Sequence, residues 1–337
     1  MIPDDFLQLF ERQSHNLPQG VRLGLASPTL VTGEVVYGQF NSNSESGIGR
    51  IDLRNGEFER LVVFDPAASG VAWMAAEPPW LVWTLGNSTT NVADWSLLAR
   101  NLDTGRTLTL ATAKAPDGTF LFGQQPLPAI REGRVSWAQP LPKRGPNPEA
   151  EIHVYDLAAA RDTVLATGRV SSPVYAGGRL IWASRSADDA KFSFQAVGGV
   201  DLRPIQLPER LRDPGSVLYL AGSAESLAWN ADGGHAAIWA FDTSTYSVYQ
   251  APDLKHQFQF LQVAGPFLLW YGGITSSVLD LRTGKGFDVA GTLAASAEGI
   301  AASDIVRASG SRATGFAASR VGLAHLSEAP RISTCQP

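Results

Sequence analysis

The sequence predicts an all-β fold made of repeated units, and three observations support this class. A short apolar stretch that ends in an aromatic residue returns at fairly even intervals along the chain. Glycine (33 residues) and proline (21 residues) are frequent and 18% of the residues are charged, which is typical of compact β proteins with many turns. After the first twenty residues, no stretch of useful length has clear helical periodicity.

The first element along the chain is a predicted helix over residues 3–13. Phe6, Leu9 and Phe10 follow the spacing i, i+3, i+4, and two aspartates occupy the first turn, where the helix dipole favours negative charge. We expect this helix to pack as a cap. Residues 1–20 are therefore predicted to be an N-terminal helix and cap, and residues 21–337 the repeat domain.

Each repeat is recognised by its anchor, the apolar stretch that we assign to the second strand of the unit. The anchors are Val35-Val36-Tyr37, Leu81-Val82-Trp83, Val135-Ser136-Trp137, Leu180-Ile181-Trp182, Leu227-Ala228-Trp229, Leu268-Leu269-Trp270 and a degenerate Ile300-Ala301-Ala302. Their last residues are 46, 54, 45, 47, 41 and 32 positions apart. A four-stranded propeller blade takes about 40–45 residues, so the count predicts a seven-bladed β-propeller. Six blades follow if the degenerate copy belongs to the first blade.

The remaining strands of each unit follow from the residues around the anchor. A first strand such as 71–75 precedes it, a third strand ends in a turn such as 101–105 or 280–284, and a fourth strand such as 107–111 closes the unit. Asn or Asp before the turn and glycine inside it suit short hairpin loops. A four-stranded sheet buries both faces only by stacking on its neighbours. The last unit, 292–335, is expected to be thin, with the N-terminal segment as a candidate to help close the ring.

This pattern resembles the bacterial β-propellers of the broad WD40-like and TolB-like group, over roughly residues 20–335. The shared motif is architectural. The chain lacks a Trp-Asp dipeptide at strand ends, a Gly-His pair that starts a repeat, a Trp-Ser-Pro-Asp-Gly box and a kelch double glycine beside paired Tyr and Trp. The resemblance therefore implies a fold and binding at one face, and it implies no reaction.

Charge and composition exclude several classes of function. The net charge is −5 and the sequence has no basic run, so nucleic-acid binding is not expected. No apolar run approaches the ~20 residues of a membrane-spanning helix. The single cysteine, Cys335, cannot form an internal disulfide or a cysteine metal site. We expect a monomer without a membrane span.

The N-terminal residues do not resemble an export signal, because acidic residues stand where such a signal carries positive charge. We expect an extracytoplasmic protein, periplasmic or secreted, if an export signal has been removed. Otherwise the protein is expected in the cytoplasm.

The loops between the second and third strands vary most in length, and loops on a rigid scaffold usually carry binding residues. These predicted loops are 40–47, 84–95, 138–151, 183–191, 230–235, 271–275 and 303–314. We take this face as the working surface, with Trp95, Arg144, Asp188 and Tyr271 as candidate binding residues.

Two of these candidates have specific arguments. Arg144 lies in the loop 138–151, whose four prolines predict a stiff arm for a partner protein; the alternative is a solvated insertion. Trp95 ends its loop outside the anchor pattern, so an exposed indole there would stack a sugar ring or anchor an interface. For Trp95, as for Trp80 and Trp239, the alternative is ordinary strand packing.

The most polar cluster predicted at this face combines Asp188 with Asp232, His235 and Asp304. Such carboxylates and a histidine would bind Ca²⁺ or Mg²⁺, with Asp188 and Asp232 as ligands, or would act as acid and base through Asp232, His235 and Asp304. The alternative is that the Asp232–His235 stretch is a tight hairpin turn. The chain lacks a Gly-x-Ser-x-Gly elbow, a P-loop and a dinucleotide fingerprint.

The sequence therefore favours a non-enzymatic binding module, without a cofactor, that presents its long-loop face to a protein or a carbohydrate. The alternative is a metal-assisted lyase or hydrolase with its site in the central funnel. The two hypotheses differ because an enzyme needs several ionisable side chains that converge on one pocket.

Overall fold

The structure is a computed structural model, and it describes residues 3–24, 31–65, 68, 70–91, 93–115, 117–121, 123–142, 149–185, 191–211, 214, 217, 219–231, 235–250, 260–271, 276–289, 293–303 and 320–332. The chain divides into two compact units. The first unit combines residues 1–66 with 249–337, and the second comprises residues 67–248. No helix in the described ranges is long and apolar enough to cross a membrane.

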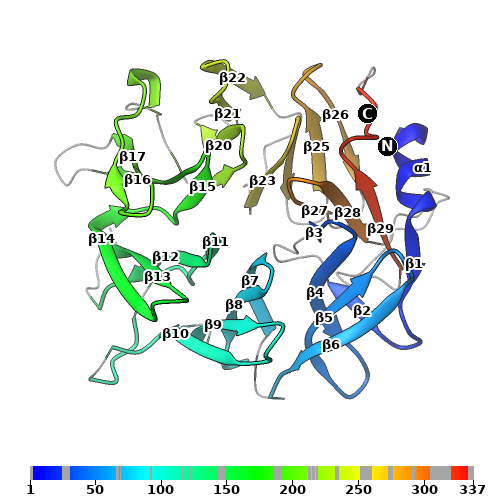
Figure 1. Ribbon diagram of the computed structural model, residues 1–337, viewed down its shortest axis with the longest axis horizontal. Coiled ribbons are helices and arrows are strands. Elements are labelled where there is room, and N and C mark those ends of the chain that lie inside the picture. Colours follow the sequence, from blue (N-terminus) through cyan, green and yellow to red (C-terminus); the bar gives the residue numbers. More distant parts are fainter. Residues whose placement is uncertain are drawn as a thin grey trace. The chain divides into compact units, whose positions relative to one another are not determined.

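The first unit contains the helix α1 (Asp4–Arg12) and three antiparallel sheets (Figure 1). One sheet has the order β2 (Arg22–Gly24), β4 (Val35–Asn41), β5 (Ser46–Asp52), β6 (Glu57–Val63), with β3 (Val31–Thr32) also paired to β4. The second is β23 (Phe260–Ala264), β24 (Phe267–Tyr271), β25 (Ser276–Asp280), β26 (Lys285–Val289). The third is β1 (Ser14–Asn16), β29 (Arg320–His325), β28 (Gly299–Ser303), β27 (Leu293–Ala295).

The predicted N-terminal helix is confirmed, and its apolar face is buried. Phe6, Leu9 and Phe10 are 0%, 7% and 2% exposed. The Phe6 ring meets Phe267 edge-on at 5.6 Å and lies 5.1 Å from Phe287. Directly after the helix, β1 pairs with β29, so the N-terminal segment supplies the outer strand of the sheet that also holds the last strand (Figure 1).

The second unit contains three further sheets. One has the order β7 (Gly70–Glu77), β8 (Trp80–Gly86), β9 (Trp95–Asn101), β10 (Thr107–Thr112). Another consists of β19 (Leu220–Gly222), β20 (Ser226–Ala231), β21 (His235–Ala240) and β22 (Thr245–Gln250), which ends in the first residues of the other unit. A single turn of 3-10 helix, η1 (Glu209–Leu211), precedes this sheet.

The third sheet of the second unit has eight strands in two runs. The first run is β11 (Ala129–Arg131), β12 (Arg134–Pro140), β13 (Ala150–Asp156) and β14 (Arg161–Val170). The second run is β15 (Val174–Ala176), β16 (Arg179–Arg185), β17 (Phe192–Gly198) and β18 (Arg203–Pro204). The end of β14 pairs with the end of β16, and this short contact joins the runs.

The anchors form the core between sheets, as predicted. Trp83, Trp137, Trp182 and Trp229 lie in β8, β12, β16 and β20 and are at most 4% exposed. Residues of β15–β17 pack with residues of β19–β21 in one cluster, where the Phe194 ring meets Trp229 at 5.1 Å. Face-to-face burial of this kind holds neighbouring sheets together because each sheet covers the apolar face of the next.

The hairpin turns at the ends of the third strands also follow the prediction. The Asp280 carboxylate accepts a hydrogen bond of 2.9 Å from the backbone amide of Arg282. The side-chain oxygen of Asn101 accepts one of 2.9 Å from the backbone amide of Thr104. Gly105 and Gly284 have φ values of 71° and 67°, which a residue with a Cβ rarely adopts. These side chains and glycines explain why the turns are short and alike.

Candidate functional site

Trp95 is a core residue of the second unit. It is 1% exposed and packs with Leu97, Val135 and Trp137. Its cross-strand partner is Gly86, which leaves room for the indole because it has no side chain. The expectation of an exposed ring is therefore wrong for Trp95, and the strand-packing interpretation holds for it. Trp239, 6% exposed, packs in the same manner in its own sheet.

Tyr271 is the last residue of β24 in the first unit and is 4% exposed. Burial raises the pKa of its hydroxyl group above the usual value of 10. The ring is therefore part of the packed sheet, and its hydroxyl is neutral at physiological pH.

The predicted polar cluster is described only at His235. This histidine begins β21, opposite Ala231 of β20, and is half-buried. Arg144, Asp188, Asp232 and Asp304 lie outside the described residues. Within the described parts of the chain, no three His, Cys, Asp or Glu side chains form a group able to hold a metal ion.

The structure brings together two arginines that the sequence analysis did not connect. Arg169 in β14 and Arg185 in β16 are direct cross-strand partners, at the contact that joins the two runs of the eight-stranded sheet. Directly opposite residues point to the same face of a sheet, where like charges are destabilising. We call Arg169 and Arg185 the arginine pair. Arg185 ends β16 at the start of the predicted loop 183–191, so the pair lies at the predicted working end.

Both members of the arginine pair lack an ion-pair partner among the described residues. Arg185 Cζ lies 5.6 Å from the centre of the Phe192 ring, a cation–π contact. Its Nε atom is buried without a hydrogen-bond partner in the described structure. A buried donor of this kind normally has a partner, because leaving it unpaired costs about 1–3 kcal/mol.

A second facing pair of arginines in the same unit gives a useful contrast. Arg131 and Arg134 are cross-strand partners in β11 and β12. Arg131 Nε lies 3.6 Å from a Glu132 carboxylate oxygen, and Arg134 Nε lies 4.0 Å from Asp156. That pair is neutralised by carboxylates of the chain, so a facing arginine pair does not by itself require an external anion. The arginine pair at 169 and 185 differs because its described surroundings supply no carboxylate.

Two pockets of the second unit lie at hairpin turns, away from the end of β16 that carries Arg185. One of about 180 Å³ is bounded by Arg131, Arg134 and Tyr175. Another of about 390 Å³ is bounded by Arg179, Trp239 and Phe241, where the Arg179 guanidinium lies 5.0 Å from the Phe241 ring centre. Arg131 and Arg134 in the first pocket already have carboxylate partners. Among the described residues, no guanidinium donor of either pocket is buried without a hydrogen-bond partner, in contrast to Arg185 Nε.

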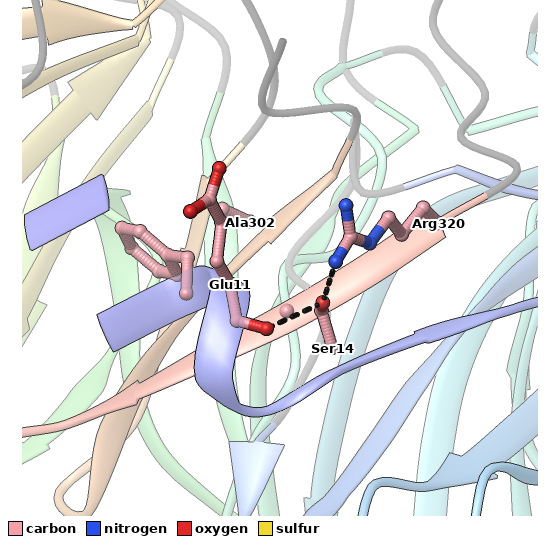
Figure 2. Close-up of a pocket in the computed structure, with 6 residues that line it drawn as sticks. Glu11, Ser14, Ala302 and Arg320 are labelled. Carbon is pink, nitrogen blue, oxygen red and sulfur yellow. Dashed lines mark hydrogen bonds between the residues drawn. The ribbon is translucent and has the colours of Figure 1, made fainter. Parts of the chain in front are cut away.

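A third pocket, in the first unit, has a volume of about 20 Å³, enough for one water molecule (Figure 2). Arg320 donates a hydrogen bond to Ser14 Oγ at 2.5 Å, and Ser14 Oγ donates to the Glu11 carbonyl oxygen at 3.0 Å. These contacts connect β29, β1 and the end of α1. The pocket is a joint between these elements, too small for an organic ligand.

The fold class is now defined: the chain is all-β, with a short N-terminal helix and a β-propeller arrangement of small antiparallel sheets. Three solved structures show this likeness. An oligogalacturonate lyase in complex with manganese has a TM-score of 0.55 at 11% identity, covering 94% of this chain and 91% of that chain. An oligogalacturonate lyase from Vibrio parahaemolyticus has a TM-score of 0.59 at 10% identity, covering 91% and 92%. A chain of the mitotic checkpoint complex has a TM-score of 0.51 at 12% identity, covering 92% and 95%.

Neither a protein-family model nor a curated protein sequence matches the chain. At 10–12% identity the structural neighbours show the fold alone. They include an enzyme and a component of a protein assembly, so the fold does not choose between the two functional hypotheses.

Proposed function

We propose that this protein is a non-enzymatic binding module that binds an anionic group of a protein or a carbohydrate at the loop end of β16. The arginine pair carries the proposal. Arg169 and Arg185 face each other without a described carboxylate, and Arg185 has a buried donor without a partner in the part of the chain that the structure describes. Guanidinium groups bind carboxylate and phosphate with paired hydrogen bonds, each contributing about 1.5–3 kcal/mol.

The proposal includes seven blades, with the arginine pair where two of them join. The two four-strand runs of the eight-stranded sheet support this count, because each run contains one anchor tryptophan, Trp137 or Trp182, in its second strand. A crystal structure of the full chain is the measurement that counts the blades.

A metal-assisted lyase is the second candidate, because two structural neighbours are oligogalacturonate lyases and one is described in complex with manganese. Oligogalacturonate is itself rich in carboxylates, which suit an arginine pair. In this candidate, Asp188 and Asp232 would hold Ca²⁺ or Mg²⁺, and His235 and Asp304 would transfer protons. Of these four residues the structure describes His235 alone. The described residues contain no group of three His, Cys, Asp or Glu side chains that could hold a metal ion.

Titration calorimetry with oligogalacturonate as a polyanionic probe tests the proposed function. Arg185→Gln removes one charge of the arginine pair, and Arg203→Gln is the matched control, because Arg203 is 80% exposed and already paired with Asp201 at 3.0 Å. We expect Arg185→Gln to weaken binding about tenfold, the equivalent of one charged hydrogen bond, and Arg203→Gln to leave it unchanged. Equal binding by both variants would overturn the proposal, because the arginine pair carries it.

The same samples decide between the two candidates. With manganese, calcium or magnesium added, a lyase converts the probe into an unsaturated product that absorbs in the ultraviolet. We expect binding without this absorbance. Metal-dependent product formation that is lost in Asp232→Asn would establish the lyase instead.

A further inference from the structure

The strand next to the arginine pair has an open edge. β17 runs from Phe192 to Gly198, but its outer neighbour β18 contains two residues, Arg203 and Pro204. These pair with Gly198 and Val197, and the Ile205 amide then donates to the Ala196 carbonyl oxygen at 2.8 Å. Beyond that point no described strand pairs with Phe192–Gln195 on the outer side. We call this part of β17 the open edge.

The fourth strands of the other repeats in the second unit are much longer. β10, β14 and β22 have six, ten and six residues. β10 and β14 pair along most or all of the neighbouring strand. The open edge is therefore a local feature of the sheet that carries Arg185. An uncovered edge is a template for a further strand, since its amide and carbonyl groups remain available.

The direction of the free backbone groups follows from the pairing. Peptide groups alternate along a strand, and Ala196 points its carbonyl toward the outer side. Phe194 and Phe192, two and four residues earlier, therefore point their amide and carbonyl groups to the same side. The Phe194 ring is anchored in the core against Trp229. This packing holds the open edge in an extended conformation before any partner binds.

The arginine pair and the open edge lie in one row across the sheet. Arg169 is opposite Arg185, and Arg185 is opposite Phe192, so the three residues face the same side. The Arg185 guanidinium leans over the Phe192 ring, toward the open edge. The next strand in this row would lie about 4.8 Å beyond β17. An acidic side chain at that position is within the combined reach of two long side chains.

We propose that the anionic partner is an extended acidic peptide of another protein, which adds as a strand to the open edge and places a carboxylate on Arg185. This inference rests on the proposed function and decides between its two kinds of partner. A peptide supplies the alternating donors and acceptors that the open edge requires, whereas a carbohydrate has no such backbone. The peptide would occupy the positions that a longer β18 would fill.

The test uses the full chain and three labelled or competing probes in fluorescence anisotropy. The first is a short peptide of alternating valine and threonine with glutamates at its centre. The second is the same peptide with N-methyl groups on alternate amides, which keeps the carboxylates but blocks strand pairing. The third is oligogalacturonate, which supplies carboxylates without a peptide backbone. We expect the first peptide to bind, and the N-methylated peptide to bind at least about tenfold more weakly.

Two variants of the open edge complete the test. Phe192→Pro removes the outward amide at the first residue of β17, a strand position where proline is tolerated. Phe192→Leu keeps that amide and is the matched control. Weaker peptide binding in Phe192→Pro but not in Phe192→Leu supports strand addition, and weaker binding in Arg185→Gln supports the carboxylate contact.

Each remaining outcome overturns a defined part of the inference. Equal binding of both peptides, or equal loss in both Phe192 variants, overturns strand addition and leaves an anion site. Binding of oligogalacturonate without peptide binding overturns the protein partner but keeps the proposed function. If Arg185→Gln changes neither probe, the proposed function fails together with this inference.

Discussion

The carboxylate of Asp280 accepts a hydrogen bond of 3.0 Å from the backbone amide of Ile332, 52 residues further along the chain. Asp280 is 0% exposed and also accepts two bonds of 2.9 Å from the Arg282 guanidinium. Arg282 in turn donates to the Pro330 carbonyl oxygen at 3.0 Å. One buried carboxylate thus connects a hairpin turn of the first unit to the segment that follows its last strand.

Asp280→Asn is expected to lower the free energy of unfolding by about 2 kcal/mol, because it weakens charged hydrogen bonds to a buried group. Asp242→Asn is the matched control, since Asp242 occupies a similar hairpin turn but is exposed. Urea denaturation measures both variants. A loss below about 0.5 kcal/mol for Asp280→Asn would contradict the role assigned to this carboxylate.

We expect Tyr175 to make the stability of the folded state depend on pH in the alkaline range. Burial raises the pKa of its hydroxyl from 10.0 to about 12. The folded state therefore keeps a proton that the unfolded state loses, so Tyr175 contributes stability that is present below pH 10 and is lost as the pH rises toward 12. Thermal unfolding between pH 9 and 12 should show a smaller decline for Tyr175→Phe than for wild type. An equal decline for Tyr246→Phe and Tyr175→Phe would refute this assignment.

Phe6→Ala tests the packing of the N-terminal helix. The ring is fully buried against Phe267 and Phe287, and removing such a side chain costs about 3–5 kcal/mol. The exposed neighbour in the same helix, Asp5, provides the control variant Asp5→Ala. Denaturant titration followed by intrinsic fluorescence measures both. A loss of less than about 1 kcal/mol for Phe6→Ala would mean that the helix contributes little to the folded state.

Removing one charge of the arginine pair is expected to stabilise the folded protein although it weakens anion binding. Facing like charges destabilise a sheet by about 0.2–1 kcal/mol, so Arg169→Gln should raise the unfolding midpoint in a buffer without polyvalent anions. Arg203→Gln, which breaks an exposed ion pair, should change it little. A lower midpoint for Arg169→Gln would show that a carboxylate of the chain already neutralises the pair.

Local sequence signals predicted the repeated elements well. The anchor tryptophans were assigned to the second strands and are buried there, because an apolar run that ends in an aromatic residue has no other favourable place in a sheet stack. The hairpin turns followed from Asp or Asn and glycine at fixed positions. For Trp95 the interpretation as an exposed ring is wrong and the strand-packing alternative is right. A position after a loop suggests exposure, whereas the place of Trp95 opposite Gly86 depends on the register of two strands.

The arginine pair was beyond these signals for a similar reason. Arg169 and Arg185 belong to different repeats, and they meet because the end of β14 crosses to pair with β16. The register between strands of two different repeats leaves no local pattern in the sequence. The open edge was also hidden, because Arg203, Pro204 and Ile205 begin an ordinary outer strand that ends after the Ile205 amide.

The pairing of β1 with β29 has a consequence for the order of synthesis. Residues 14–16 leave the ribosome about three hundred residues before their partners at 320–322. During translation, β1 therefore remains without its neighbouring strand β29 while the residues between them are synthesised. Contacts between such distant segments fold slowly, since the loop entropy is lost before the contact forms. Completion of this sheet is therefore expected only after β29 has been synthesised.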